Sequence, residues 1–157
     1  MFKRKKELSI EEVINKKLKG EAQTNALGFV AFLRAEGFSL KWNPKHNGWR
    51  FECKGKLAGM VYVARAGCEL IVNICTLDFD GGGPVDDELK EFAWAHAVAC
   101  PLGCDGTEIC EKSQKNIAIF GRVYENICIT PLMIMNPDAK DLEHAKKLVL
   151  MIRQNRR

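Results

Sequence analysis

The feature that most constrains the fold is a run of short alternating segments between positions 38 and 77. Apolar and polar residues alternate in its first half, which is typical of strands with one buried face. Asn47-Gly48 is a strong hairpin signal, and glycines at 55 and 67 mark two further turns. No interval is long enough for a crossover helix, so neighbouring strands must be antiparallel. The predicted strands are residues 38–43, 49–54, 57–65 and 68–77.

Helical patterns flank this run on both sides. Ser9 and Glu12 are spaced as a capping box, and Gly20 is expected to end the helix that they begin. Thr24 or Asn25 is expected to cap a second helix that ends near Gly37. Later elements are predicted as a helix over 87–99, strands over 116–120 and 124–130, and a last helix capped by Asn136. The expected fold is α+β, with an antiparallel sheet of about five or six strands, made of the meander plus later strands, and helices packed on one face.

Charge is distributed unevenly along the chain. The first 20 residues hold seven basic and three acidic side chains, which accounts for the whole net charge of +4. Residues 78–111 hold nine acids and one base. We therefore expect residues 1–8 to form a basic mobile arm and residues 9–157 to form a single α+β domain. A uniformly basic face for nucleic acid is not indicated.

Composition points to a cytoplasmic protein without a membrane segment. No apolar run approaches the roughly 20 residues that span a bilayer, and the basic start lacks the apolar region of a secretory signal. Seven cysteines are present, an odd number whose spacing suggests no disulfide framework. The partners of the chain, including a small-molecule ligand and any second copy, are not identified by the sequence.

A cysteine cluster is the candidate metal site. Cys100, Cys104 and Cys110 lie in one short polar segment, and Cys128 could return from a later strand as a fourth ligand. His96, four residues before Cys100 on the same helix face, could substitute for one thiol. Four sulfur ligands, or three with an imidazole, suit a structural zinc ion. The alternative is that these cysteines are buried structural thiols, as free cysteines commonly are.

Aromatic residues of the meander are the candidate ligand pocket. Trp42, Trp49 and Tyr62, with Trp94 from the next helix, could line a cavity for an apolar ligand. The alternative is that aromatic residues on an inward sheet face are simply core under the helices.

No segment carries a reaction motif such as G-x-S-x-G, H-E-x-x-H or G-x-G-x-x-G. The sequence therefore predicts a non-enzymatic binding or regulatory domain, with a structural zinc ion as its candidate stabiliser. Two alternatives stay open, a small-molecule sensor that uses the aromatic pocket and a thiol-dependent enzyme.

Two segments carry a resemblance. They are I-F-G-R-V-Y-E-N-I-C at 119–128 and N-P-D-A at 136–139. With the order of elements between Thr24 and Arg153, they resemble an uncharacterised family of small bacterial cysteine-containing α+β proteins. The resemblance implies that the four cysteines act together, and it transfers no catalytic role. Cys104 and Cys110 are spaced differently from that family's pattern.

Overall fold

The computed structural model describes residues 7–74, 85–97, 115–127 and 132–154, which form helices and antiparallel sheets. The predicted α+β class is confirmed. The helices are α1 (Ile10–Lys17), α2 (Gly20–Ala35), α3 (Asp87–His96) and α4 (Ala139–Gln154). None of these described helices combines the length and the apolar character needed to cross a membrane.

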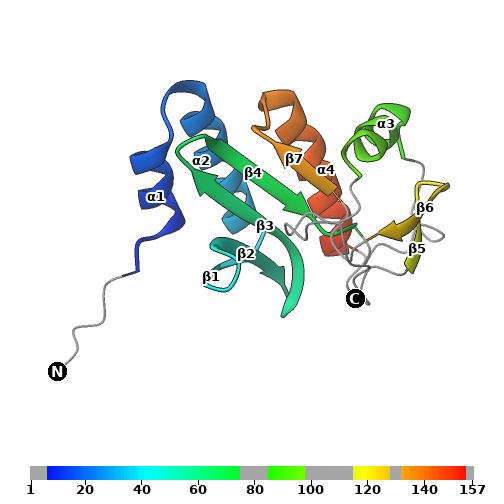
Figure 1. The fold of residues 1–157 in the computed structure, drawn as a ribbon, viewed down its shortest axis with the longest axis horizontal. Helices are drawn as coiled ribbons and strands as arrows, with labels where there is room; N and C mark the ends of the chain where they lie inside the picture. Colours follow the sequence, from blue (N-terminus) through cyan, green and yellow to red (C-terminus); the bar gives the residue numbers. More distant parts are fainter. Residues whose placement is uncertain (1–6, 75–84, 98–114, 128–131, 155–157) are drawn as a thin grey trace.

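A five-stranded antiparallel sheet lies at the centre of the described fold (Figure 1). The first four strands of this sheet are paired in the same order as they follow in the chain, which confirms the hairpins of the predicted meander. Asn47, Lys54 and Gly55 have φ angles of 57°, 51° and 75°, the left-handed values that tight hairpin turns need. In spatial order the strands are β1 (Ser39–Asn43), β2 (Gly48–Cys53), β3 (Lys56–Ala64), β4 (Gly67–Val72) and β7 (Leu132–Met135).

The later strands differ from the prediction in their arrangement. The predicted strands at 116–120 and 124–130 correspond to β5 (Lys115–Ile119) and β6 (Arg122–Ile127), and residues 128–130 lie outside the described part of the chain. These two strands form a separate hairpin. The main sheet is completed instead by β7, which pairs with β4 and was not predicted.

The second helix begins earlier than predicted. Ser9 and Glu12 do form the reciprocal capping box of α1. Gly20, however, starts α2 directly, with a φ angle of 62°, so Thr24 and Asn25 lie inside the helix and are not its caps. The left-handed conformation of this glycine lets the chain turn within two residues of α1.

The last helix begins later than predicted. Asn136 is not its N-cap. The amide of Asp141 donates to the carboxylate of Asp138 (2.8 Å), and the amide of Asp138 donates to the carboxylate of Asp141 (3.1 Å). This reciprocal pair caps α4 at Ala139 and leaves Asn136 available for a contact with β4.

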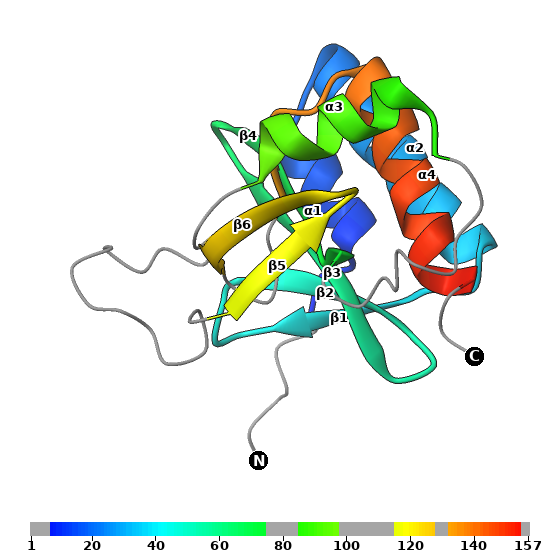
Figure 2. The same cartoon turned by 90° about the vertical axis from the view of Figure 1, so that its right-hand side faces the viewer.

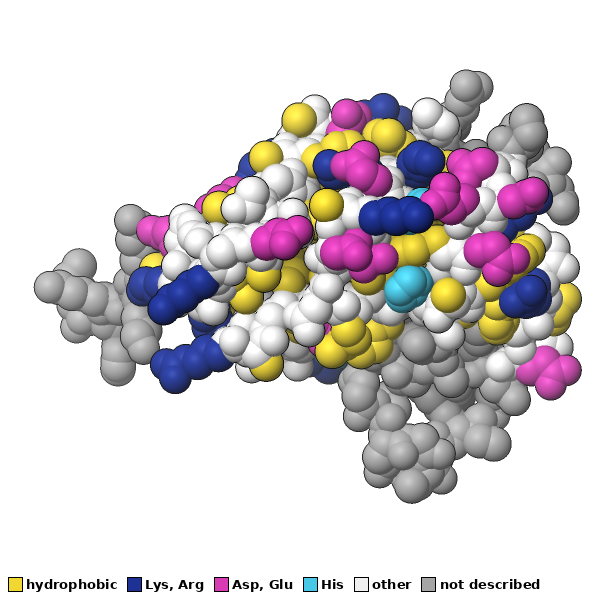
Figure 3. Space-filling model, turned by 90° about the horizontal axis from the view of Figure 1, so that it is seen from above, with side chains coloured by type: hydrophobic (Ala, Val, Ile, Leu, Met, Phe, Trp, Pro, Cys, Tyr) yellow, Lys and Arg dark blue, Asp and Glu magenta, His cyan; other side chains and the backbone are white. Residues whose placement is uncertain are grey.

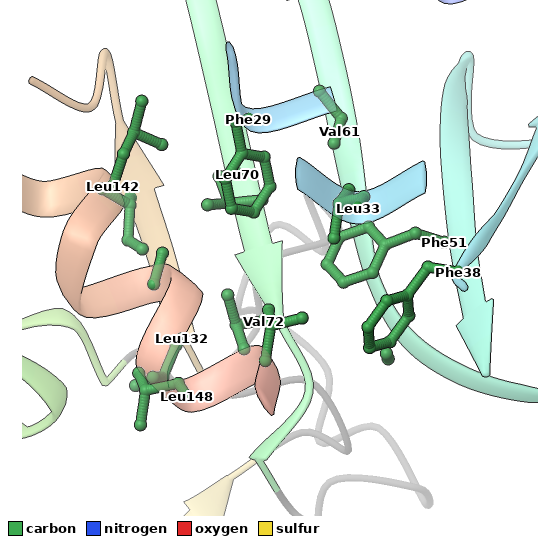
Figure 4. Close-up of a cluster of buried hydrophobic side chains, with 14 of the residues drawn as sticks. Phe29, Leu33, Phe38, Phe51, Val61, Leu70, Val72, Leu132, Leu142 and Leu148 are labelled. Carbon is green, nitrogen blue, oxygen red and sulfur yellow. The ribbon is translucent and has the colours of Figure 1, made fainter. Parts of the chain in front are cut away.

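The core lies between the main sheet and the helices α1, α2 and α4. Figure 4 shows Phe29 and Leu33 of α2 and Leu142 and Leu148 of α4 directed toward the sheet. The sheet side chains that meet them include Val61, Leu70, Val72 and Leu132. Helix α3 contacts α4, β7 and β5, so it lies with the β5–β6 hairpin at the β7 end of the molecule (Figure 2).

The predicted alternation of buried and wet residues fails at Glu52. Its residue exposure is only 9%, although the pattern places it on the wet face of β2. Trp49, Phe51 and Cys53 all belong to the core, so Glu52 keeps the opposite face of β2 and is buried there, and the register shift between Phe51 and Glu52 leaves Ala58 of β3 unpaired. The Glu52 carboxylate is paired with Lys41 (3.2 Å) and Arg50 (3.0 Å), so its charge is compensated.

Surface charges of both signs are mixed. Figure 3 shows acidic and basic side chains interspersed over the right-hand half of the face seen from above. Two ion pairs join α4 to the first turn of α3 and its N-cap: Lys140 with Glu88 (2.8 Å) and Lys147 with Asp86 (3.6 Å). Of the predicted arm, residues 1–6 lie outside the described residues.

Candidate ligand-binding site

Strand pairing places three side chains in one row across β3, β4 and β7. Tyr62 is directly opposite Glu69, and Glu69 is directly opposite Met135. Such residues share a face of the sheet, with Cβ atoms about 4.5–5.5 Å apart. Side chains alternate between the two faces along each strand. The row therefore lies on the face turned away from the helices, since the adjacent row belongs to the helix-covered core: Val61, Leu70 and Ile134.

A pocket of about 190 Å³ surrounds this row, and we call it the carboxylate pocket. Glu69 supplies its one acidic side chain, and small residues of the β3–β4 turn form part of the wall. The pocket is lined by Tyr62, Ala64, Ala66, Glu69, Met135 and Asn136, together with Gly67 and Cys68.

The end of the pocket is built by a contact between β4 and the residue after β7. The amide of Asn136 donates to the carbonyl of Cys68 (2.7 Å), and the Asn136 Oδ1 atom accepts from the amide of Cys68 (3.2 Å). A Cβ atom on Gly67 would lie 1.7 Å from that Oδ1 atom. Glycine at 67, with a φ angle of 144°, is therefore required for the close approach of the two segments.

The Glu69 carboxyl group has no compensating positive charge among the residues that line the pocket. Partial burial raises the pKa of the Glu69 carboxyl group, and Glu69 has no ion pair or hydrogen bond with any residue that the structure describes. Burial also raises the pKa of Tyr62, and the nearby Glu69 carboxylate raises it further. Among the described residues the other partly buried acids are compensated: Glu11, Glu36 and Glu52 have basic partners, and Asp141 accepts the amide of Asp138.

Cys68 separates the pocket from a second cavity. Its pKa is raised to about 11, first by burial and then by the Glu69 carboxylate. Cys68 is opposite Val63, which belongs to the core, so its thiol faces the helices and not Glu69. There it borders a cavity of about 50 Å³ beneath Phe29 and Leu142. A thiol with so high a pKa is a poor nucleophile near neutral pH.

The four aromatic residues predicted to line a pocket are not brought together. Trp42 and Trp49 pack edge to face, with ring centroids 4.6 Å apart, on the helix-covered side of the sheet. Tyr62 is on the opposite face, because it follows Val61, the partner of Trp49. Trp94 belongs to α3, where its indole donates to the Ile119 carbonyl (2.7 Å). Only Tyr62 lines the carboxylate pocket.

The predicted zinc ligands fall almost entirely outside the described residues. This holds for Cys100, Cys104, Cys110 and Cys128. His96 is described, at the last position of α3, and its Nδ1 atom lies 2.8 Å from the Phe92 carbonyl oxygen. Within the described ranges no three His, Cys, Asp or Glu side chains are grouped so that they could hold a metal ion.

Sequence reasoning missed Glu69 and Met135 as site residues. The signal for Met135 was present in Leu132-Met-Ile-Met135, a short alternating run between Pro131 and Asn136-Pro137. Strand β7 follows from this run, and it is the partner that completes the row at Glu69.

Comparison with models of protein families, with curated proteins and with solved structures found no match to the chain.

Proposed function

We propose that the chain is a non-enzymatic ligand-binding domain and that the carboxylate pocket is its binding site. The observation that carries the proposal is the Glu69 carboxylate, which is partly removed from water without a partner among the described residues. Such a group costs free energy in the unliganded fold. A ligand that compensates it would recover this free energy on binding, and perturbed carboxyl groups in concave sites often mark function.

The scaffold around Glu69 also supports binding. The row Tyr62, Glu69 and Met135 stands on three hydrogen-bonded strands, which hold side chains in a more fixed geometry than loops do. The pKa values of Tyr62 and Cys68 are raised, opposite to the depressed values of activated nucleophiles. These features favour binding over covalent chemistry at this site.

The test is a screen of small neutral, anionic and cationic fragments, followed by amide chemical shifts of the ¹⁵N-labelled chain. We expect some fragments to shift the amides of Cys68, Glu69 and Met135. Ala64→Phe is the blocking variant, because Ala64 is exposed at the end of β3 and lines the pocket. Fragment shifts that survive in this variant, or a screen without any shift at the three amides, would overturn the proposal.

We further propose that a structural zinc ion stabilises the domain through Cys100, Cys104, Cys110 and Cys128, with His96 as the substitute ligand. The supporting observation is the contact of His96 with the Phe92 carbonyl. A carbonyl can only accept, so the proton is assigned to Nδ1 and the lone pair to Nε2. Metal-bound histidines are commonly held in this way by a backbone carbonyl.

Elemental analysis of protein purified without added metal tests the zinc proposal. We expect about one zinc ion per chain, and a melting temperature that falls on chelation or in Cys104→Ser, since metal binding contributes to folding free energy. His46→Gln is the control, because His46 lies in the β1–β2 turn. Negligible zinc, together with a melting temperature that does not change with chelator, would overturn the zinc proposal and favour the alternative that the four cysteines are structural thiols.

A further inference from the structure

We infer that the carboxylate pocket recognises an organic ammonium cation, and a methylated ammonium group in preference to a primary one. The inference rests on the proposed function and adds the chemical class of the ligand. Its three supports are the charge of the lining, the side chains beside Glu69 and the supply of hydrogen-bond acceptors.

The lining carries one negative charge and no positive one. Glu69 is its single carboxylate, and no Lys, Arg or His side chain lines the pocket. The other titratable groups, Tyr62 and Cys68, both have raised pKa values and are neutral at pH 7. A partly desolvated site of this kind attracts cations and repels anions.

The neighbours of Glu69 suit an organic cation. Tyr62 is directly opposite Glu69 and lines the pocket, with one edge of its ring against Gly48 of β2, and aromatic rings attract ammonium groups. The Tyr62 hydroxyl donates to the Met60 sulfur atom (3.2 Å), which restrains the ring. On the other side Met135 is 59% exposed and offers a flexible, polarisable thioether.

A metal cation fits the same residues poorly. Calcium takes six to eight oxygen ligands, and magnesium needs nearly octahedral coordination. Here Glu69 is one carboxylate, and the Asn136 Oδ1 atom already accepts from the Cys68 amide. The same shortage of acceptors disfavours a primary ammonium group, whose three N–H donors would compete for one carboxylate. A methylated ammonium group has fewer donors or none.

The size of the pocket limits the ligand further. At about 190 Å³ it is smaller than the roughly 300–1,000 Å³ of sites for drug-sized molecules. It therefore accepts a head group and not a large ligand. Anything attached to the ammonium group would extend past the exposed Met135 into solvent.

The test compares three probes of similar size by amide chemical shifts. They are choline, ethanolamine and 3,3-dimethylbutan-1-ol, the neutral analogue of choline. We expect choline to shift the amides of Cys68, Glu69 and Met135, and the neutral analogue to bind at least about tenfold more weakly. Glu69→Gln should weaken choline binding to a similar extent. Glu91→Gln should not, because Glu91 is an exposed acid on α3.

The outcomes separate this inference from the proposed function. Equal binding of choline and its neutral analogue, unchanged in Glu69→Gln, would overturn cation recognition and leave a pocket for neutral ligands. Tighter binding of ethanolamine than of choline would overturn the preference for methylated groups. No binding of these probes or of any screened fragment would overturn both proposals. The amide spectrum of Glu69→Gln without ligand confirms that the variant is folded.

Discussion

Gly59 is the position where the structure predicts the sharpest effect of adding one methyl group. It lies in β3 between Phe51 of β2 and Val72 of β4. A Cβ atom there would lie 2.1 Å from the Ile71 carbonyl oxygen and 2.3 Å from the Phe51 ring. The first obstacle is backbone, and the second belongs to a fully buried side chain. Neither can withdraw without moving the sheet or the core.

The Phe51 ring is itself confined by two other rings. Phe29 meets it at 6.3 Å and Phe38 at 6.1 Å, both nearly perpendicular to it. Overpacking of such a core costs about 1–3 kcal/mol, and the backbone clash places Gly59→Ala at the upper end. For a domain of this size about 3 kcal/mol corresponds to a melting temperature lower by about 6–12 °C.

Gly28→Ala is the matched control. Gly28 is exposed in the middle of α2, and a Cβ atom there would meet nothing within 4 Å. Because alanine is a better helix former by about 1 kcal/mol, this variant should melt about 2–4 °C higher than the parent. Circular dichroism melts of the two variants measure both shifts. A Gly59→Ala melt within about 2 °C of the parent would refute the packing argument.

Three further predictions concern titratable groups. At pH 8 the Cys68 thiol, with its pKa near 11, should react with iodoacetamide at least about tenfold more slowly in the folded than in the unfolded chain; equal rates by peptide mass spectrometry would contradict this. Folding raises the pKa of Glu69, so the contribution of its carboxyl group to stability is present below the unfolded pKa and is lost as pH rises. Glu69→Gln should therefore melt at no lower a temperature than the parent at pH 8. A lower melting temperature would count against a desolvated carboxylate. A hydrogen bond from Arg34 lowers the pKa of Glu11, so the ionised Glu11 carboxylate stabilises the fold at pH 7 and this stabilisation is lost as pH falls. Glu11→Gln should therefore melt at a slightly lower temperature than the parent at pH 7 but not at pH 3. Because this pair is partly exposed, the loss should be at most about 1 kcal/mol, and a melt unchanged at pH 7 would show that the pair contributes nothing.

The parts of the fold that the sequence predicts correctly depend on local chemistry. The turn at Asn47 and the one at Lys54-Gly55 each contain an Asn or a Gly, which accept a positive φ angle, so the hairpins follow from a few neighbouring positions. The capping box at Ser9 and Glu12 is equally local. The start of α2 was misjudged because Thr24 and Asn25 are good caps in isolation. In the structure the helix already begins at Gly20, so Thr24 and Asn25 are helical, and the next residue, Ala26, is a buried position of α2.

The candidate site depends on a contact that no local pattern encodes. Glu69 appears in the sequence as a polar residue of an alternating strand, and such a residue is usually solvated. Its environment changes when β7 pairs with β4 and brings Met135 beside it. Register between distant segments decides this, and register is fixed by the buried face of both strands, here Leu70 opposite Ile134.

Formation of the pocket and completion of the sheet are therefore coupled. The bonds between Asn136 and Cys68 close the end of the pocket and also hold β7 at the edge of β4. The near contact of Asn136 with Gly67 makes this junction intolerant of a larger residue at 67. The Glu69 side chain, by contrast, contributes charge and no hydrogen bond or ion pair to any described residue of the neighbouring strands. If the proposed binding site is correct, stability depends on the junction and recognition on the carboxylate, so we expect a change at Glu69 to alter binding without loosening β7.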